Sequence, residues 1–283
     1  MSPAPNPAPD PLRRTPPPSP QSLRPLTPLQ PLRWLALGAH DLLRAPTVGL
    51  LHGLAMAGFG AVLLLLAHDR FWFLAGAFSG FLVVAPVLAV GLYAVARALE
   101  NRAPAGTALV WRTWLSWRGT GGRPHDWRLV RFGALLALAG TGWVLTSAAL
   151  ITWLAPQPVR APVDFLRHVV LAEDPTLFAL WLLLGGVLAA PVFASSVITL
   201  PLLQDRRIGL LDAVLTSWRV VLANPLPMAV WATLIGLCVM LGFVTALLGL
   251  VVLLPVLGYA SWHAYRDCVD ASALPRRDDD GPP

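Results

Sequence analysis

The chain contains no lysine, only two cysteines and few charged residues of any kind. All 21 basic residues are arginines, and charged residues make up 13% of the 283 positions. We attribute the missing lysine to base composition of the gene rather than to a phosphate-binding chemistry. Cys238 and Cys268 stand apart in the sequence, so a disulfide framework or a four-cysteine metal site is excluded.

Ionisable side chains are nearly absent from the long apolar runs. Hydrophobic residues make up 56% of the chain, and its mean hydropathy is +0.63. About 20 helical residues cross a ~30 Å hydrocarbon core, and several runs reach that length, which predicts an all-α polytopic membrane protein. A net charge of +6 could indicate nucleic acid. Arginine gathered on the cytoplasmic side of a membrane protein explains the charge instead, so no nucleic-acid partner is expected.

The apolar runs and the segments between them predict a regular order of helices. Six membrane spans are predicted, at residues 47–67, 71–96, 132–154, 176–203, 227–243 and 247–265. Three amphipathic segments, at 33–44, 108–118 and 209–222, precede successive pairs of spans. The prolines of Ala45-Pro46 and Asn224-Pro225 break the first and the third and can start the next helix. Turns are expected at 68–70 and 119–124. The amphipathic segments are too short and too charged to cross a bilayer, and they carry Trp and Arg. We therefore expect them to lie in the membrane interface.

This order predicts a unit used three times: an interfacial helix, a span, and a second span with an internal proline (Pro86, Pro191 or Pro255). Residues 86–88 and 255–257 both read Pro-Val-Leu, and an arginine follows eleven residues after each proline, at Arg97 and Arg266. The middle copy is weaker, since that position holds leucine. Two spans per unit give successive units the same orientation, so the repeat is parallel rather than inverted.

The ends of the chain differ from the apolar region between them. Residues 1–31 contain twelve prolines, and Pro16-Pro17-Pro18-Ser19-Pro20 has the composition of a polyproline segment. We expect disordered tails at 1–31 and 269–283 around one six-span transmembrane domain at 32–268. With both termini cytoplasmic, eighteen arginines lie on the inner side and three on the outer side, which favours that orientation in a bacterial inner membrane.

Few polar groups inside the spans could form a site. His52 could relay protons or bind a ligand, but a neutral histidine bonded to a neighbouring carbonyl near the headgroups is favoured. Ser195, Ser196 and Thr199 could line a polar path. Hydroxyls beside a helix proline more often satisfy backbone groups freed by that proline or bond across helices.

A second group of candidates lies at the ends of the second spans. Tyr259, His263 and Arg266 share one helical face, which could hold an anionic lipid headgroup. The alternative is an aromatic belt with an arginine that reaches toward the headgroups, and it is favoured. Tyr93 and Arg97 form the corresponding pair after Pro86. Small residues such as Gly53 and Gly58 predict close helix packing, and Gly76-x-x-x-Gly80 is a weak dimerisation motif.

Motifs of the common enzyme classes are missing from the sequence. It contains no nucleophile elbow, Walker loop, HExxH motif or paired carboxylates within a span. The six histidines are placed unlike those of a haem-copper core. We therefore expect no enzymatic activity, no cofactor and no metal.

Four stretches together resemble a known family. They are residues 86–93 (PVLAVGLY), 197–206 (VITLPLLQDR), 217–225 (SWRVVLANP) and 254–266 (LPVLGYASWHAYR). They are similar to the bacterial integral-membrane family catalogued as domain of unknown function 2189, over roughly residues 32–268. The resemblance implies a polytopic inner-membrane protein and brings with it no catalytic or binding residues.

Two functions are compatible with the sequence. The scarcity of polar groups in the spans and the three interfacial helices favour a non-enzymatic scaffold or assembly partner of a membrane complex, or a homo-oligomer in the lipid bilayer. The internal repeat and the proline-broken spans would also suit a small-molecule or lipid permease. A polar crevice that joins His52 to Ser195, Ser196 and Thr199 would favour the permease, whereas a dry centre would favour the scaffold.

Overall fold

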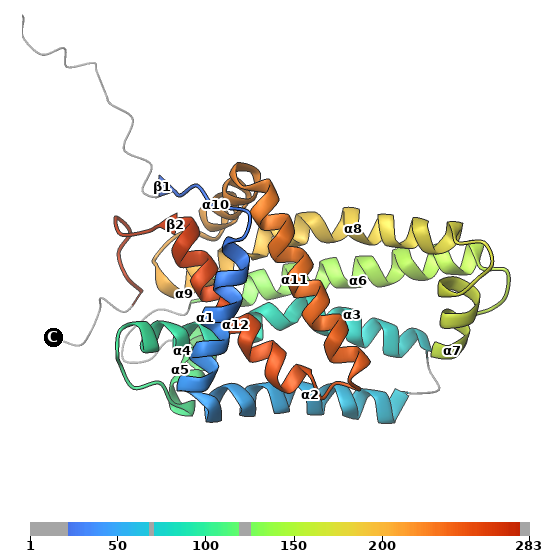
Figure 1. Ribbon diagram of the computed structural model, residues 1–283, viewed down its shortest axis with the longest axis horizontal. Helices are drawn as coiled ribbons and strands as arrows, with labels where there is room; N and C mark the ends of the chain where they lie inside the picture. The colour runs from blue at the N-terminus through green and yellow to red at the C-terminus, as the bar shows by residue number, and fades with distance from the viewer. Residues whose placement is uncertain (1–21, 68–70, 119–125, 278–283) are drawn as a thin grey trace, which may run out of the picture.

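The computed structural model describes residues 22–67, 71–118 and 126–277, and helices dominate this part of the chain (Figure 1). The helices in chain order are α1 (Gln30–Arg44), α2 (Pro46–Ala67), α3 (Phe71–Leu88), α4 (Val90–Glu100), α5 (Thr107–Leu115), α6 (Arg128–Leu154), α7 (Pro162–Phe165), α8 (Thr176–Ser196), α9 (Thr199–Asp205), α10 (Leu210–Ala223), α11 (Pro225–Val244) and α12 (Leu250–Cys268). A 3₁₀ turn (Ser116–Arg118) follows α5, and a π-helical turn (Leu166–Val170) follows α7. The polyproline segment Pro16–Pro20 and the turns expected at 68–70 and 119–124 lie outside the described residues.

Two sharp corners convert an amphipathic helix into a long apolar one. α2 and α11 each begin at a proline, which is favoured in the first helical turn because its missing N–H has no helical partner there. The preceding residues have almost the same backbone geometry, with φ −132° and ψ 58° at Ala45 and φ −131° and ψ 56° at Asn224. The corners predicted from Ala45-Pro46 and Asn224-Pro225 are therefore confirmed.

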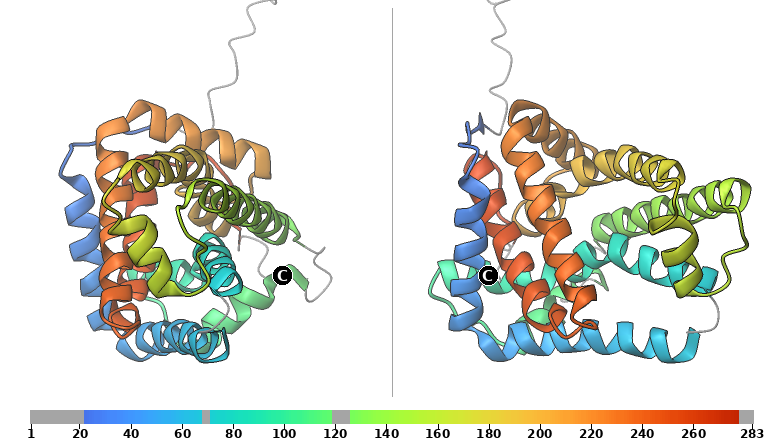
Figure 2. Two further views of the ribbon diagram at one scale, coloured as in Figure 1. Left: turned by 90° about the vertical axis from the view of Figure 1, so that its right-hand side faces the viewer. Right: turned by 45° about the vertical axis from the view of Figure 1, so that its right-hand side comes forward.

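The helices divide between the body of the molecule and its two ends. In Figure 1, α2, α3, α6 and α8 run along the long axis, and α7 lies at one end. α1, α4, α5, α9 and α10 gather at the opposite end, as the turned views in Figure 2 also show. We call the amphipathic helices α1, α5 and α10 the collar, and the end where they lie the collar end.

Four segments among the described residues are long and apolar enough to cross a membrane. They are Pro46–Leu65, Arg128–Leu154, Thr176–Asp205 and Pro225–Val244, and they correspond to the first, third, fourth and fifth predicted spans. No more than 33% of the residues in the most apolar stretch of each segment are buried, as is expected of helices that face lipid. Helices also form at the second and sixth predicted spans, as α3 and α12. That these two cross the membrane stays a prediction, as do the three repeats and the orientation.

Two of the predicted spans are broken in the structure. The helix expected over 71–96 ends at Leu88 and begins again at Val90, within a turn of Pro86, whose ring removes a backbone hydrogen bond. The helix expected over 176–203 is interrupted at Val197 and Ile198. This break places Pro201 in the first turn of α9, where a proline is tolerated. Both proline-containing spans are therefore interrupted, and Thr176–Asp205 as a whole still has the length and composition of one membrane span.

Parts of both tails that were expected to be disordered have a defined structure. β1 (Ser22–Leu23) pairs antiparallel with β2 (Val269–Asp270), so residues 22–31 and 269–277 have defined positions. The backbone N–H of Leu26 donates to Oδ1 of Asn224 at 3.0 Å. Val269 and Ala271 are buried in the main core. Residues 1–21 and 278–283 lie outside the described residues.

The main core lies at the collar end. α1 packs on α12, α5 packs on α4, and α10 packs on α8 and α9. α4, α9 and α12 also contact one another there. The largest fully buried side chains of this core come from α1, α4, α9, α11 and α12 and include Trp34, Leu92, Leu200, Trp231, Tyr259, Trp262 and Tyr265. The polar groups that join these helices therefore lie beside a packed apolar core.

Candidate functional site: the polar cluster of the collar end

The polar cluster is organised around the last two turns of α12. α12 is buried on most of its surface from Pro255 onward, because α1, α2 and α4 pack against it. Gly38 of α1 permits a close approach: a Cβ at this position would overlap the carbonyl oxygen of Val256. The polar residues of α12 that follow this contact therefore meet three other helices, and some of them, such as Arg266, stay partly exposed.

The first pair joins α12 to α1. Nε2 of His263 lies 2.7 Å from Oδ2 of Asp41, whose side chain is only 5% exposed. Arg44 approaches the other oxygen of Asp41 at 3.4 Å. One turn of α12 further on, Asp267 accepts hydrogen bonds from Nε1 of Trp34 at 2.8 Å and from Nε2 of Gln30 at 2.7 Å. α1 is thus fixed to α12 by two carboxylates, one on each helix.

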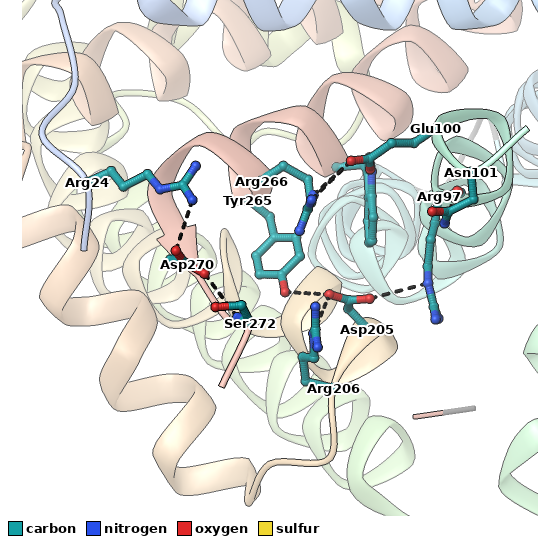
Figure 3. A network of polar contacts seen from close by, with 11 residues as sticks. Arg24, Arg97, Glu100, Asn101, Asp205, Arg206, Tyr265, Arg266, Asp270 and Ser272 are labelled. Carbon is teal, nitrogen blue, oxygen red and sulfur yellow. Dashed lines mark hydrogen bonds and ion pairs between the residues drawn. The ribbon is translucent and has the colours of Figure 1, made fainter. Parts of the chain in front are cut away.

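The second pair joins α12 to α9 and α4 through Asp205, the last residue of α9 (Figure 3). Oδ2 of Asp205 accepts from the hydroxyl of Tyr265 at 2.8 Å and from Nε of Arg206 at 2.9 Å. Nε of Arg97, on α4, lies 3.3 Å from Oδ1. The Asp205 side chain is 5% exposed, so its charge is balanced almost entirely by these neighbours.

The third pair joins α12 to α4 at the surface. Oε2 of Glu100 accepts from Nε1 of Trp262 at 2.9 Å, and Oε1 lies 3.1 Å from Nη2 of Arg266 (Figure 3). Both charged side chains of this pair are more than a third exposed. Solvent screens it more than the Asp205 cluster, so it contributes less to stability.

The C-terminal segment crosses the same end of the molecule. Nη1 of Arg277 donates to Oε1 of Gln204 at 2.7 Å, and Nη2 lies 3.2 Å from Oδ2 of Asp126. Arg128 also donates to Asp126, with Nη2 at 2.8 Å from Oδ2. These hydrogen bonds, those of Arg128 above all, hold the pKa of Asp126 below its usual value despite partial burial. We call residues 269–277 the C-terminal strap.

The candidates within the spans have separate partners. The buried ring of His52 lies against Trp114 of α5, with ring centroids 5.6 Å apart. Oγ of Ser195 accepts from Nε1 of Trp218 at 2.9 Å. Ser196 donates to the carbonyl of Val192, and Thr199 donates to those of Ser195 and Ala213. The three hydroxyl groups thus bond to the helix backbone or to a neighbouring helix. His52 packs against Trp114, and none of these contacts joins it to the hydroxyl groups.

The candidates at the helix ends lie in or beside the polar cluster. Arg97, His263 and Arg266 are placed against the carboxylates of Asp205, Asp41 and Glu100. Tyr93 and Tyr259 are buried in the main core, and the Tyr259 hydroxyl has no hydrogen-bond partner among the described residues. Of the candidates at the helix ends, the structure therefore places the charged side chains in the polar cluster and the two tyrosines in the adjoining apolar core.

Sequence analysis missed the acidic half of this cluster. Asp41 falls on the buried face of α1 with Trp34, Gly38 and Leu42, and an acid in an apolar stripe at helical spacing is a signal that a buried partner exists. Asp205 and Glu100 end apolar helices and gave a weaker signal. Among the described residues, no group of three or more histidine, cysteine or acidic side chains is placed to hold a metal ion.

Taken together, the apolar helices and the polar end define an integral membrane protein. Residues 71–205 match the model of a family described as "Predicted integral membrane protein (DUF2189)". This match confirms the resemblance found in the sequence, and it includes the stretch at 86–93 and most of that at 197–206. The stretches at 217–225 and 254–266 lie beyond it. No curated protein and no solved structure matches the chain.

Proposed function

We propose that this protein is a non-enzymatic scaffold or assembly partner for another membrane complex. It spans a bacterial inner membrane six times, with both termini in the cytoplasm and the collar at the cytoplasmic surface. This orientation is supported by the arginines, because it places eighteen of them on the cytoplasmic side and three on the outer side. The meeting of β1 and β2 at the collar end supports a common side for both ends of the domain.

The observation that carries this proposal is that the polar side chains of α12 bind other helices of the same protein. His263, Tyr265, Arg266 and Asp267 are bonded to α1, α9, α4 and again α1. Interactions of this kind fix helices relative to one another, and a rigid end with exposed apolar helices beside it suits the docking of other membrane proteins. The closely packed core at the same end adds to that rigidity.

Purification in a mild detergent tests the scaffold. We expect a tagged chain, expressed at its native level, to co-elute with at least one membrane protein in a fixed ratio that mass spectrometry can identify. An unrelated six-span protein with the same tag serves as the control. Recovery of the chain alone, with no protein enriched over this control, would reject the scaffold.

A permease is the second candidate, and the packing of the collar favours it. If the three units are α1–α4, α5–α9 and α10–α12, then α5 packs on the second span of the first unit and α10 on that of the second. α1 packs on α12, the second span of the third unit, which closes the cycle. Repeated units with interrupted helices are common in transporters. Proteoliposomes would show solute or lipid flux above protein-free vesicles if this candidate were right, and no flux if it were wrong.

A further inference from the structure

The three collar helices carry large apolar side chains on their exposed sides. Leu43 of α1 is 79% exposed, Trp111 of α5 is 60% exposed, and Leu222 of α10 is 70% exposed. Each helix also has a buried face, because α1 packs on α12, α5 packs on α4, and α10 packs on α8 and α9. A helix packed on one side needs only one apolar face. The second apolar face of each collar helix is therefore available to a partner outside the chain.

The faces follow the same order in all three collar helices. An exposed apolar residue is followed by an exposed polar residue and then by a buried one, in Leu32-Arg33-Trp34, Ala39-His40-Asp41, Trp111-Arg112-Thr113 and Leu211-Asp212-Ala213. Successive residues of an α-helix are rotated by about 100° around its axis, so these three positions define three faces. Each collar helix thus has an apolar face, a polar face and a buried face, in one rotational order.

The proline corners place two of these helices at the membrane surface. α1 ends at Arg44, and α2 begins at Pro46, the first residue of a segment long and apolar enough to cross the membrane. α10 and α11 are joined in the same way at Pro225. Exposed leucines lie on both sides of each corner, namely Leu43 and Leu50 at the first and Leu222 and Leu226 at the second. The exposed apolar faces of α1 and α10 therefore continue onto helices that face lipid.

The collar helices lie around one end of the molecule rather than on one side of it. In the left view of Figure 2, which looks along the long axis of Figure 1, α1, α10 and α5 lie at different edges. α1 and α10 also run across the direction of α2, α3, α6 and α8. A single protein partner would cover one of these edges, whereas a lipid leaflet surrounds all of them. Lipid is therefore the occupant that fits these faces.

We propose that the exposed apolar faces of α1, α5 and α10 form one band that lies among the acyl chains of the leaflet at the collar end. The polar faces, which follow the apolar faces in the same rotational order, point to the water beside that leaflet. At the opposite end, the described residues form one short helix, α7, and the π-helical turn that follows it. The band therefore widens the protein in one leaflet only.

A band in one leaflet gives the protein a preference for curved membrane. Amphipathic helices that lie in the interface bind membranes in a curvature-dependent way. A convex leaflet exposes more acyl surface between its headgroups, so we expect the protein to gather where the leaflet at the collar end is convex. This preference goes beyond the scaffold proposed above and does not depend on it. It holds on whichever side of the membrane the collar lies.

The accessibility of spin labels tests the band. Single cysteines are introduced into the full chain after Cys238 and Cys268 are replaced by alanine. The six exposed positions form three matched pairs, each with a polar residue and a leucine three residues later: His40→Cys and Leu43→Cys, Arg112→Cys and Leu115→Cys, and Arg219→Cys and Leu222→Cys. In bilayers, we expect nitroxides at the leucine positions to be more accessible to oxygen, and those at the polar positions to a water-soluble nickel complex.

Two results of this experiment would overturn the proposal. Greater access of nickel than of oxygen at the leucine positions would show that the apolar faces meet water. Leucine positions shielded from both reagents would show that protein, such as a second copy of the chain, covers them.

Sorting between flat and curved membrane tests the curvature preference. Labelled protein is reconstituted into giant vesicles, a membrane-impermeant quencher identifies those with the collar outside, and a thin tube is drawn from each. We expect wild type to be enriched in the tube relative to a lipid dye, because the outer leaflet of the tube is convex. The variant Leu43→Gln/Leu115→Gln/Leu222→Gln should lose this enrichment.

The matched control is His40→Gln/Arg112→Gln/Arg219→Gln, which changes the polar faces of the same three helices and should keep the enrichment. Both variants should unfold at the temperature of wild type, because all six side chains are exposed. Equal density of wild type in tube and vesicle would overturn the preference. Equal enrichment of the two variants would overturn it as well, because the apolar faces would then have no part in the sorting.

Discussion

Buried acids near the ends of two helices, α1 and α9, are the residues on which this structure depends most. Asp41 and Asp205 are each 5% exposed and lie against basic groups from other helices. Sequence analysis singled out His263 but missed Asp41, its partner 222 residues away, although Asp41 falls on an apolar face. Helical periodicity shows which face of a helix is buried and leaves open which helix covers it. The pairings therefore required the fold.

Replacement of Asp205 by asparagine tests the buried cluster. The change leaves Arg97 and Arg206 without their carboxylate in a place where both are largely shielded from water. We expect the variant Asp205→Asn to lose about 3–5 kcal/mol of stability, as found when one partner of a buried pair is removed. Thermal unfolding of the purified protein in detergent measures it.

Glu100→Gln is the matched control, since that pair is more than a third exposed. Its loss should stay below about 1 kcal/mol. Equal destabilisation by the two variants would contradict the distinction between a buried and a screened pair.

Asp126 gives the C-terminal strap a pH dependence. Hydrogen bonds from Arg128, with the charge of Arg277 nearby, hold the pKa of Asp126 below its unfolded value of about 4. Its contribution to stability is therefore complete above that value and disappears as the pH falls through the lower folded pKa. We expect wild type to unfold at a higher temperature than Asp126→Asn at pH 6, and the difference to shrink below about pH 4. A difference that stays constant from pH 3 to pH 7 would contradict this role.

At the scale of elements, local chemistry predicted the helices well, but not the exact residues at which the proline-containing spans are interrupted. The corners at Pro46 and Pro225 follow from the stereochemistry of proline and were predicted. Pro86, Pro191 and Pro255 all stand inside apolar runs, yet only the first two runs are broken nearby. Whether a helix bends or stops after a proline depends on the helices packed around it. The sequence alone does not contain that information.

Two glycines of α2 test the packing of α2 against α12. A Cβ at Gly53 would overlap the carbonyl oxygen of Val251, whereas a Cβ at Gly58 would meet no atom within 4 Å. We expect Gly53→Ala to destabilise the protein by about 1–3 kcal/mol, because the backbones must move apart. Gly58→Ala, in the same helix, should be close to neutral. The two unfolding temperatures give the comparison, and equal values would contradict the observed contact.

At the scale of the whole molecule, the collar end is an interlocked assembly of segments from both ends of the chain. β1 pairs with β2, α1 packs on α12, and the C-terminal strap binds Gln204 and Asp126. The sequence did not predict the ordered part of the tails, because two-residue strands and a single arginine contact leave no periodic pattern. It predicted the all-helical membrane class, because long apolar runs have few alternatives.

The sixth span is central to this account, because α12 both carries the polar cluster and is proposed to return the chain to the cytoplasm. Single cysteines at Leu248, in the exposed turn before α12, and at Ala273, in the C-terminal strap, can be labelled in intact cells with a membrane-impermeant maleimide. The native Cys238 and Cys268 are replaced by alanine beforehand. We predict that Leu248→Cys reacts from outside and that Ala273→Cys reacts only after the membrane is opened. Reaction of both from the same side would show that α12 does not cross the membrane and would contradict the six-span topology.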